Sequence, residues 1–209
     1  METFTASGAI THGWELFKKR PWFFIGVTAL YCVVQWLIGQ IASAVGQGVL
    51  SFIIDFGLSA LAQLCMISFA LKAHDSVDDV SLADAWKPER YIQYLGVYVL
   101  MGIAVIGGLI LLIVPGIIAS LMFIFSEYIV IEKNISSIDA MKESMRITNG
   151  HKWDLFVFLL LTILVIVAGI IALGVGIFVA MPVIALATVH AYRVLSVSPG
   201  PITLENPVA

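Results

Sequence analysis

Six long apolar stretches, separated by short polar segments, dominate the hydrophobicity pattern of the chain. A helix that crosses a hydrocarbon core about 30 Å thick needs about 20 residues, and all but the fourth stretch reach that length. The fourth follows Val114-Pro115-Gly116, a turn signal with a helix breaker, but tilt or local bilayer thinning lets a short helix span. The pattern predicts six membrane-spanning helices, roughly over residues 22–44, 48–71, 91–114, 116–131, 153–173 and 175–194.

The basic residues lie only on alternate connections: before the first stretch, between the second and third, between the fourth and fifth, and at the end of the sixth. They are Lys18, Lys19, Arg20, Lys72, Lys87, Arg90, Lys133, Lys142, Arg146, Lys152 and Arg193. Under the positive-inside rule, these connections and both termini are cytoplasmic. We therefore expect a multi-pass protein of the bacterial inner membrane, built as three helical hairpins.

The N-terminal region also allows a second interpretation, a cleaved signal peptide. Lys18-Lys19-Arg20, an apolar run and Ala42-Ser43-Ala44 imitate its three regions. The apolar run is longer than is usual for a signal peptide, and the basic cluster begins only at residue 18. We therefore favour a membrane span.

A similar segment precedes each hairpin, which indicates an internal repeat. The three segments are AITHGWELFKKRPWFF from Ala9, SLADAWKPERYIQYLG from Ser81 and AMKESMRITNGHKWDL from Ala140. Each has the pattern of a short amphipathic helix lying in the cytoplasmic headgroup plane. Because each unit crosses the membrane twice, the copies form a parallel repeat. The expected architecture is an all-α membrane bundle in one domain, residues 1–195, with repeat units at about 3–71, 80–131 and 136–194 and a flexible tail at 196–209.

The ends and apolar faces of these amphipathic segments can be predicted as well. Ser81 is an N-cap candidate in the second segment, and Pro88 limits that helix to about two turns. In the third, Ser136 or Ser137 is the expected N-cap and Gly150 the expected end. The predicted apolar faces are Ile10, Trp14 and Phe17 in the first segment and Ile138, Met141, Met145 and Thr148 in the third.

Composition narrows the class of protein further. The 209 residues are 60% hydrophobic and 12% charged, against about 25% charged in ordinary soluble domains. This excludes a soluble globule and a disordered chain. A net charge of −3 provides no basic field for nucleic acid. The two cysteines, Cys32 and Cys65, lie inside apolar runs, so they form no disulfide framework and are expected to be small buried hydrophobes.

Polar residues inside the predicted spans are candidates for an intramembrane site. Asp55 lies about two turns into the second span, where an ionisable group is costly and indicates function. The alternative is a carboxylate at the outer interface, near the start of the helix. Gln35 and Gln63 either hydrogen-bond between helices or line a polar cavity together with Asp55.

Glu127 lies about a turn inside the cytoplasmic end of the fourth span. We expect a structural ion pair with Arg146, formed when the third amphipathic helix folds back onto the bundle. A solvated carboxylate is an equally acceptable interpretation, and a transport carboxylate is a less favoured one.

No catalytic or metal-binding motif is recognisable. His12, His74, His151 and His190 are scattered, without a pair at i, i+4. We expect solvated or headgroup-facing imidazoles, no cofactor and no enzymatic activity.

Residues 114–161 resemble the YciC-like group of bacterial inner-membrane proteins, and are similar to the membrane domain fused to some glycerophosphodiester phosphodiesterases. The features that match are Pro115-Gly116 before a span, Glu127 and Glu132 leaving it, Ala140 and Ser144 on a helix, and then Arg146, Gly150 and Trp153. The resemblance implies a six-span membrane protein without known catalytic residues. These 209 residues hold no phosphodiesterase domain, so that activity is not implied.

The function favoured by these observations is that of a non-enzymatic scaffold that contacts anionic lipid or another membrane protein. Each basic residue near an anionic surface contributes about 1 kcal/mol. The candidate lipid contacts are Lys18, Lys19, Arg20, Lys87, Arg90, Lys142 and Lys152. The alternative function is a small transporter or channel that uses Asp55 and the polar residues of the first hairpin.

Overall fold

The computed structural model describes residues 4–172, 174 and 176–197, and its regular secondary structure is entirely helical over this range. Six helical stretches are long and apolar enough to cross a membrane, which confirms the all-α class and the number of candidate spans. They are α2 (Pro21–Ala44), α3 (Val49–Asp75), the stretch Leu82–Leu111 that ends in α4 (Tyr91–Leu111), the stretch Ile113–Lys133, α8 (Lys152–Ile171) and α9 (Ile177–Val197). Most of the predicted tail, residues 198–209, lies outside the described residues.

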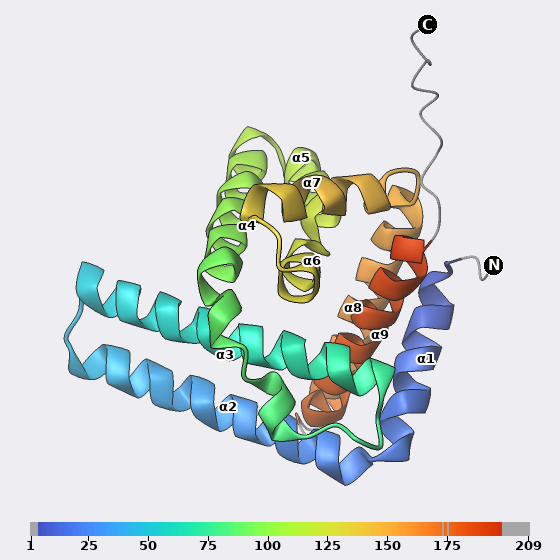
Figure 1. The fold of residues 1–209 in the computed structure, drawn as a ribbon, viewed down its shortest axis with the longest axis horizontal. Coiled ribbons are helices and arrows are strands. Elements are labelled where there is room, and N and C mark those ends of the chain that lie inside the picture. Colours follow the sequence, from blue (N-terminus) through green and yellow to red (C-terminus); the bar gives the residue numbers. More distant parts are fainter. Residues whose placement is uncertain (1–3, 173, 175, 198–209) are drawn as a thin grey trace, which may run out of the picture.

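The other elements are shorter and lie near the ends of these stretches. They are α1 (Ala6–Lys19), the 3₁₀ turns η1 (Leu82–Ala85) and η2 (Pro88–Arg90), and α7 (Ser137–Thr148). The fourth stretch consists of two helices, α5 (Ile113–Phe123) and α6 (Ser126–Lys133). In Figure 1, α2 and α3 run side by side and extend beyond the rest of the molecule, while α1 lies along α9.

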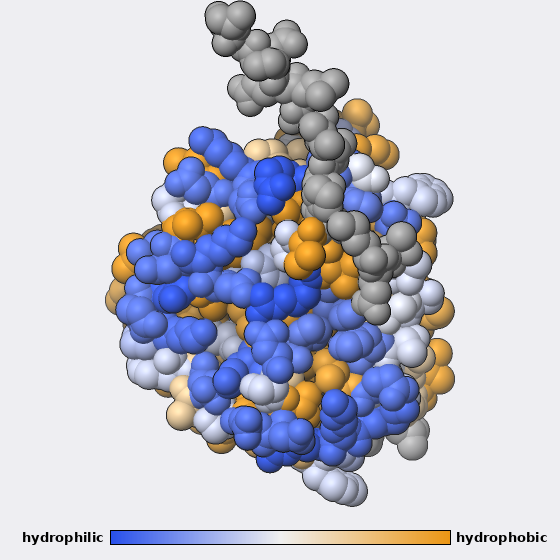
Figure 2. Space-filling model, turned by 45° about the vertical axis from the view of Figure 1, so that its right-hand side comes forward, coloured by the Kyte–Doolittle hydropathy of each residue, from blue (hydrophilic) through white to orange (hydrophobic). Residues whose placement is uncertain are grey.

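The surface has the distribution of polarity that a bilayer requires. Large apolar side chains on the long helices are exposed, including Phe52, Ile110 and Leu164, and such an extensive apolar surface marks contact with lipid or protein. Figure 2 shows one face, over the side of the molecule where α1 lies, on which hydrophilic residues gather with hydrophobic residues around them. The protein is therefore an integral membrane protein with a distinct polar face.

The connection between α4 and α5 differs from the expected turn at Pro115-Gly116. The helix breaks three residues earlier, at the extended residue Leu112, and Pro115 lies in the first turn of α5. Proline is tolerated there because the amide of a first-turn residue has no helical partner. A Cβ on Gly108 would lie only 2.8 Å from the Cα of Gly116, so the tight hairpin depends on these glycines.

A similar glycine contact closes the last hairpin. A Cβ on Gly169 of α8 would lie 3.0 Å from the carbonyl carbon of Gly176, just before α9. Small residues of this kind let membrane helices approach closely. The parallel repeat itself stays a prediction, because the segments that precede the three hairpins have different structures: an α-helix in α1, two 3₁₀ turns in η1 and η2, and an α-helix in α7.

Helix α7 covers the break between α5 and α6. The Ser144 hydroxyl donates a hydrogen bond to the Met122 carbonyl at 2.8 Å and accepts one from the Phe125 amide at 3.3 Å. Backbone groups at membrane depth need partners within the protein, and Ser144 supplies them at this break. The helix begins, as expected, with Ser136 as its N-cap, accepting from the Asp139 amide at 3.2 Å.

The buried face of α7 overlaps only in part with the predicted one, in which Thr148 is buried as expected. The structure buries small and polar residues together with one large one (Ala140, Ser144, Ile147 and Thr148) and leaves Ile138 exposed. Small side chains let α7 lie close against the break between α5 and α6. In α1, Phe17 is buried as predicted, together with Ala9 and Gly13, whereas Trp14 is exposed.

Candidate functional site

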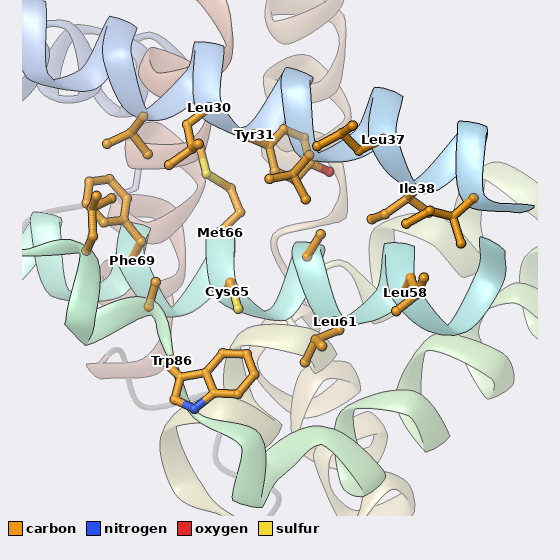
Figure 3. A pocket seen from close by; sticks show the side chains of 16 residues that line it. Leu30, Tyr31, Leu37, Ile38, Leu58, Leu61, Cys65, Met66, Phe69 and Trp86 are labelled. Carbon is orange, nitrogen blue, oxygen red and sulfur yellow. The ribbon is translucent and has the colours of Figure 1, made fainter. Parts of the chain in front are cut away.

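The α2–α3 groove is an apolar cavity of about 420 Å³ between the two helices of the first hairpin. Figure 3 shows Leu37 and Ile38 of α2 opposite Leu58 of α3, with Trp86 bordering the groove on the α3 side. Its lining residues are Val27, Leu30, Tyr31, Val34, Leu37, Ile38, Ile41, Leu58, Leu61, Ala62, Cys65, Met66, Phe69, Leu82, Ala85 and Trp86.

The one polar oxygen among the side chains of this lining is that of Tyr31, and it is already hydrogen-bonded. The Tyr31 hydroxyl donates to Gln63 Oε1 at 2.8 Å and accepts from Gln35 Nε2 at 3.2 Å. Both candidate glutamines therefore take part in a link between α2 and α3, as the first interpretation expected. The groove presents almost only apolar atoms.

Asp55, the candidate transport carboxylate, is exposed on α3. It borders neither the α2–α3 groove nor the second cavity described below. Since α3 begins at Val49, Asp55 lies about two turns into the helix. Neither of these two cavities therefore surrounds the principal residue of the transport hypothesis.

Glu127 and Arg146 do not form the expected ion pair. Arg146 instead binds Glu143 on its own helix through two hydrogen bonds, of 2.7 and 2.8 Å. Glu127 lies beside the phenols of Tyr94 and Tyr128. The reason is local: on α7 a carboxylate three residues before Arg146 is within reach without any folding back of the helix.

The Glu143 carboxylate accepts hydrogen bonds from two basic side chains, Arg146 and Lys133. Its hydrogen bonds from Arg146, together with the nearby Lys133 at 2.9 Å, lower the pKa of Glu143 to about 2. The same contact raises the pKa of the Arg146 guanidinium. The pair contributes to the stability of α7 and its attachment to the end of α6.

The candidate lipid-binding basic residues fall into two groups. Lys18, Lys19, Lys142 and Lys152 are exposed. Arg20 and Arg90 instead donate to backbone carbonyls, Arg20 to those of Val77 and Asp78 and Arg90 to those of Ile131 and Glu132. These two arginines are half-buried and use hydrogen-bond donors within the fold, so they are less available to a lipid headgroup than the exposed lysines.

Lys87 is the predicted lipid contact that lies next to the α2–α3 groove. It directly follows Trp86, which lines the groove, and it is half-buried. Lys87 and Lys72 both lie close enough to Asp84 of η1 to interact with its charge. Asp84 also accepts hydrogen bonds from the Ser81 amide and hydroxyl, at 2.8 and 2.9 Å, which fixes η1 at the edge of the groove.

A polar site, separate from the apolar groove and not revealed by the sequence, lies where α1, α3, α6 and α9 meet. Arg193 on α9 donates to Asp75 at 2.6 Å and to Glu132, which also accepts from Tyr192. Next to these charges lie three of the histidines expected to stand apart, His12, His74 and His190. No sequence signal predicted this, because the three residues come from different helices and only the fold brings them together.

Two of the histidines, His12 and His190, border the α1–α9 cavity, which has a volume of about 670 Å³. This cavity differs from the α2–α3 groove in having a mixed polar and apolar lining. Its polar residues include Thr11, Glu15, His12 and His190. It is therefore suited to water, ions or polar groups rather than to a hydrocarbon chain.

No protein-family model, no curated protein and no solved structure matches the chain.

Proposed function

We propose that this protein is a non-enzymatic protein of the bacterial inner membrane that binds one lipid molecule in the α2–α3 groove. The observation that carries the proposal is the groove itself, which has an apolar lining and lies between two helices that are each long enough to span a bilayer. A hydrocarbon chain is the ligand that matches this lining and is present at this depth of the membrane.

An apolar groove alone does not retain a lipid. Within a bilayer, a hydrocarbon chain gains no hydrophobic free energy by leaving other lipids, so binding must come from packing and from polar contacts. Lys72 and Lys87, at the η1 edge of the groove, supply positive charge for a phosphate headgroup. Residues 72–90, from the last turn of α3 to η2, also carry Asp75, Asp78, Asp79, Asp84 and Glu89, so the contact is local rather than part of a broad basic surface.

The orientation supports the same proposal. With the basic connections on the cytoplasmic side, η1 and Lys87 lie at the inner headgroup level, and the exposed Lys18, Lys19, Lys142 and Lys152 face the same leaflet. Figure 2 shows a hydrophilic face over the side of the molecule where α1 lies, which supports this orientation. Lipid binding in the groove is compatible with two further proposals: that the protein belongs to the YciC-like group, and that it contacts another membrane protein.

The direct test is native mass spectrometry of the full chain released from nanodiscs that contain phosphatidylethanolamine and phosphatidylglycerol. We expect one lipid retained per protein. Ala62→Trp places a large side chain in the lining and should abolish retention, whereas Lys87→Gln should weaken retention of phosphatidylglycerol more than that of phosphatidylethanolamine.

The matched control is Ile110→Trp, because Ile110 is 81% exposed on α4 and lines neither cavity. This variant should retain lipid like the unmodified protein. The proposal fails if the unmodified protein retains no lipid or if Ala62→Trp retains as much as the control. Retention of a stoichiometric protein partner in place of lipid would also count against it.

A further inference from the structure

Three imidazole rings from three different helices meet beside α9. His12 lies on α1, His74 near the end of α3 and His190 on α9. One ring nitrogen from each lies within 4.8 Å of the others, and all three side chains are half-buried. Imidazole nitrogens are preferred ligands of zinc and of other late transition metals.

The spacing of His74 and His190 fits a shared metal ion. His74 Nε2 lies 3.4 Å from His190 Nδ1. Two nitrogens that are each bound to a tetrahedral zinc ion at about 2.0–2.1 Å lie about 3.3–3.4 Å apart. A hydrogen bond between two neutral imidazoles would have a similar distance. The case for a metal ion therefore depends also on the third histidine and on the carboxylate beside His74.

The neighbouring carboxylate leaves His74 Nε2 available as a ligand. His74 Nδ1 lies 3.4 Å from Asp75 Oδ1, and Asp75 is held in place by Arg193 at 2.6 Å. A carboxylate that accepts from one imidazole nitrogen fixes the tautomer, so that the other nitrogen carries the lone pair for a metal. In this tautomer His74 Nε2 faces His190.

His12 supplies the third nitrogen, and the α1–α9 cavity gives access. The His12 ring stacks on that of His190, with centroids 3.9 Å apart. Because the two rings are nearly parallel, the His12 ring must turn out of this stack before its nitrogen can point at an ion shared with His190. Both rings border the cavity, as does Glu15, one turn further along α1. Three protein ligands with an open position for water or a carboxylate are typical of zinc sites that are not purely structural.

We propose that His12, His74 and His190 together bind one zinc-type divalent transition-metal ion, with the fourth position open to the α1–α9 cavity. The ion joins α1 to α3 and α9, so its occupancy controls how firmly α1 is attached to the bundle. This site is separate from the α2–α3 groove and does not depend on lipid binding.

The test uses the full chain, purified with a tag that contains no histidine, stripped with a chelator and titrated with Zn²⁺ by isothermal calorimetry. Co²⁺ is the spectroscopic probe, because its visible absorption reports tetrahedral nitrogen ligation. We expect one ion per chain. His12→Ala, His74→Ala and His190→Ala should each weaken Zn²⁺ binding at least tenfold.

The matched control is His151→Ala, since His151 lies just before α8 and outside the cluster. It should bind Zn²⁺ like the unmodified protein. Because His74 and His190 variants risk misfolding, the thermal unfolding of His12→Ala is the second measurement. Its metal-free Tm should match that of the unmodified protein, and only the rise in Tm on adding Zn²⁺ should be lost. The proposal is overturned if the unmodified protein binds no Zn²⁺, or if the cluster variants bind as the control does.

Discussion

The guanidinium of Arg193 on α9 lies 2.6 Å from the carboxylate of Asp75 at the end of α3. The same guanidinium binds Glu132 on α6, so one side chain connects three helices that are far apart in the sequence. The Arg193 guanidinium is also next to the histidine cluster, since its partner Asp75 directly follows His74. This junction holds the polar end of the helical bundle together.

Replacing Arg193 should destabilise the fold, because Asp75 and Glu132 would lose their shared cation. For Arg193→Gln we expect a loss of about 1.5–3 kcal/mol in the free energy of unfolding, the range for hydrogen bonds to charged groups. The measurement is denaturant unfolding in detergent. Arg146→Gln, which removes a more exposed guanidinium from a pair on α7, should cost less than about 1 kcal/mol. Equal effects of the two substitutions would contradict this assignment.

Gly13 is required for the contact between α1 and α9. A Cβ at this position would lie 2.5 Å from the Val183 carbonyl oxygen and 2.9 Å from the Ala187 amide nitrogen. Because both atoms belong to the α9 backbone, α1 would have to move, and overpacking of this kind costs about 1–3 kcal/mol. We expect Gly13→Ala to lower the Tm and to expose α1 to protease.

The control for this experiment is Gly26→Ala, in the interior of α2, where a Cβ would meet no atom within 4 Å. Alanine is the better helix former, so this variant should be as stable as the unmodified protein or slightly more stable. If Gly13→Ala leaves the protease resistance of α1 unchanged, the close contact with α9 is not what holds α1.

Ser144 should be important because it completes the hydrogen bonding of the break between α5 and α6. Ser144→Ala leaves the Phe125 amide without its hydroxyl partner and leaves the Met122 carbonyl only the longer hydrogen bond from Thr148, at 3.4 Å. We expect a cost of about 1–3 kcal/mol for buried groups. Thermal unfolding in detergent measures the effect. The exposed Ser43, whose hydroxyl bonds only the Gln40 carbonyl of its own helix, provides the control in Ser43→Ala. A similar Tm for the two variants would argue against this role of Ser144.

The pH dependence of stability should contain a contribution from Glu143. Its folded-state pKa, about 2, lies below the usual value of 4.5 because of the hydrogen bonds from Arg146 and the charge of Lys133. A lowered pKa stabilises the fold at pH values above the usual pKa, and this stabilisation is lost as the pH falls from about 4.5 towards 2. Glu143→Gln should therefore show a smaller loss of stability between pH 6 and pH 3. Identical pH profiles would exclude the pairing as a source of stability.

The long helices were predictable because their signal is local. An apolar run of about 20 residues has one stable conformation in a bilayer, since each backbone polar group must bond within the helix. The helix ends also follow from local chemistry, as Ser136 at the start of α7 illustrates. The break at Phe125 was not predictable, because the partner that makes it tolerable, Ser144, lies on another helix.

For the candidate functional residues, too, the sequence identified the residues but not the contacts between them. The sequence identified Gln35 and Gln63 as polar residues in spans, but only the fold showed that Tyr31 links them. It also suggested Glu127 as a partner for Arg146, whereas the nearer Glu143 takes that place. Pairings between side chains depend on distances across helices, which no spacing along the chain specifies.

The sequence by itself determined that this is a membrane protein of six apolar helices with its basic residues on alternate connections, because hydrophobic length and charge are properties of each segment. Only the tertiary structure decided which polar residues meet. The α2–α3 groove and the junction of His12, His74 and His190 both depend on how helices pack against one another. That packing is set by contacts such as Gly13 against α9, which act between residues 170 or more positions apart.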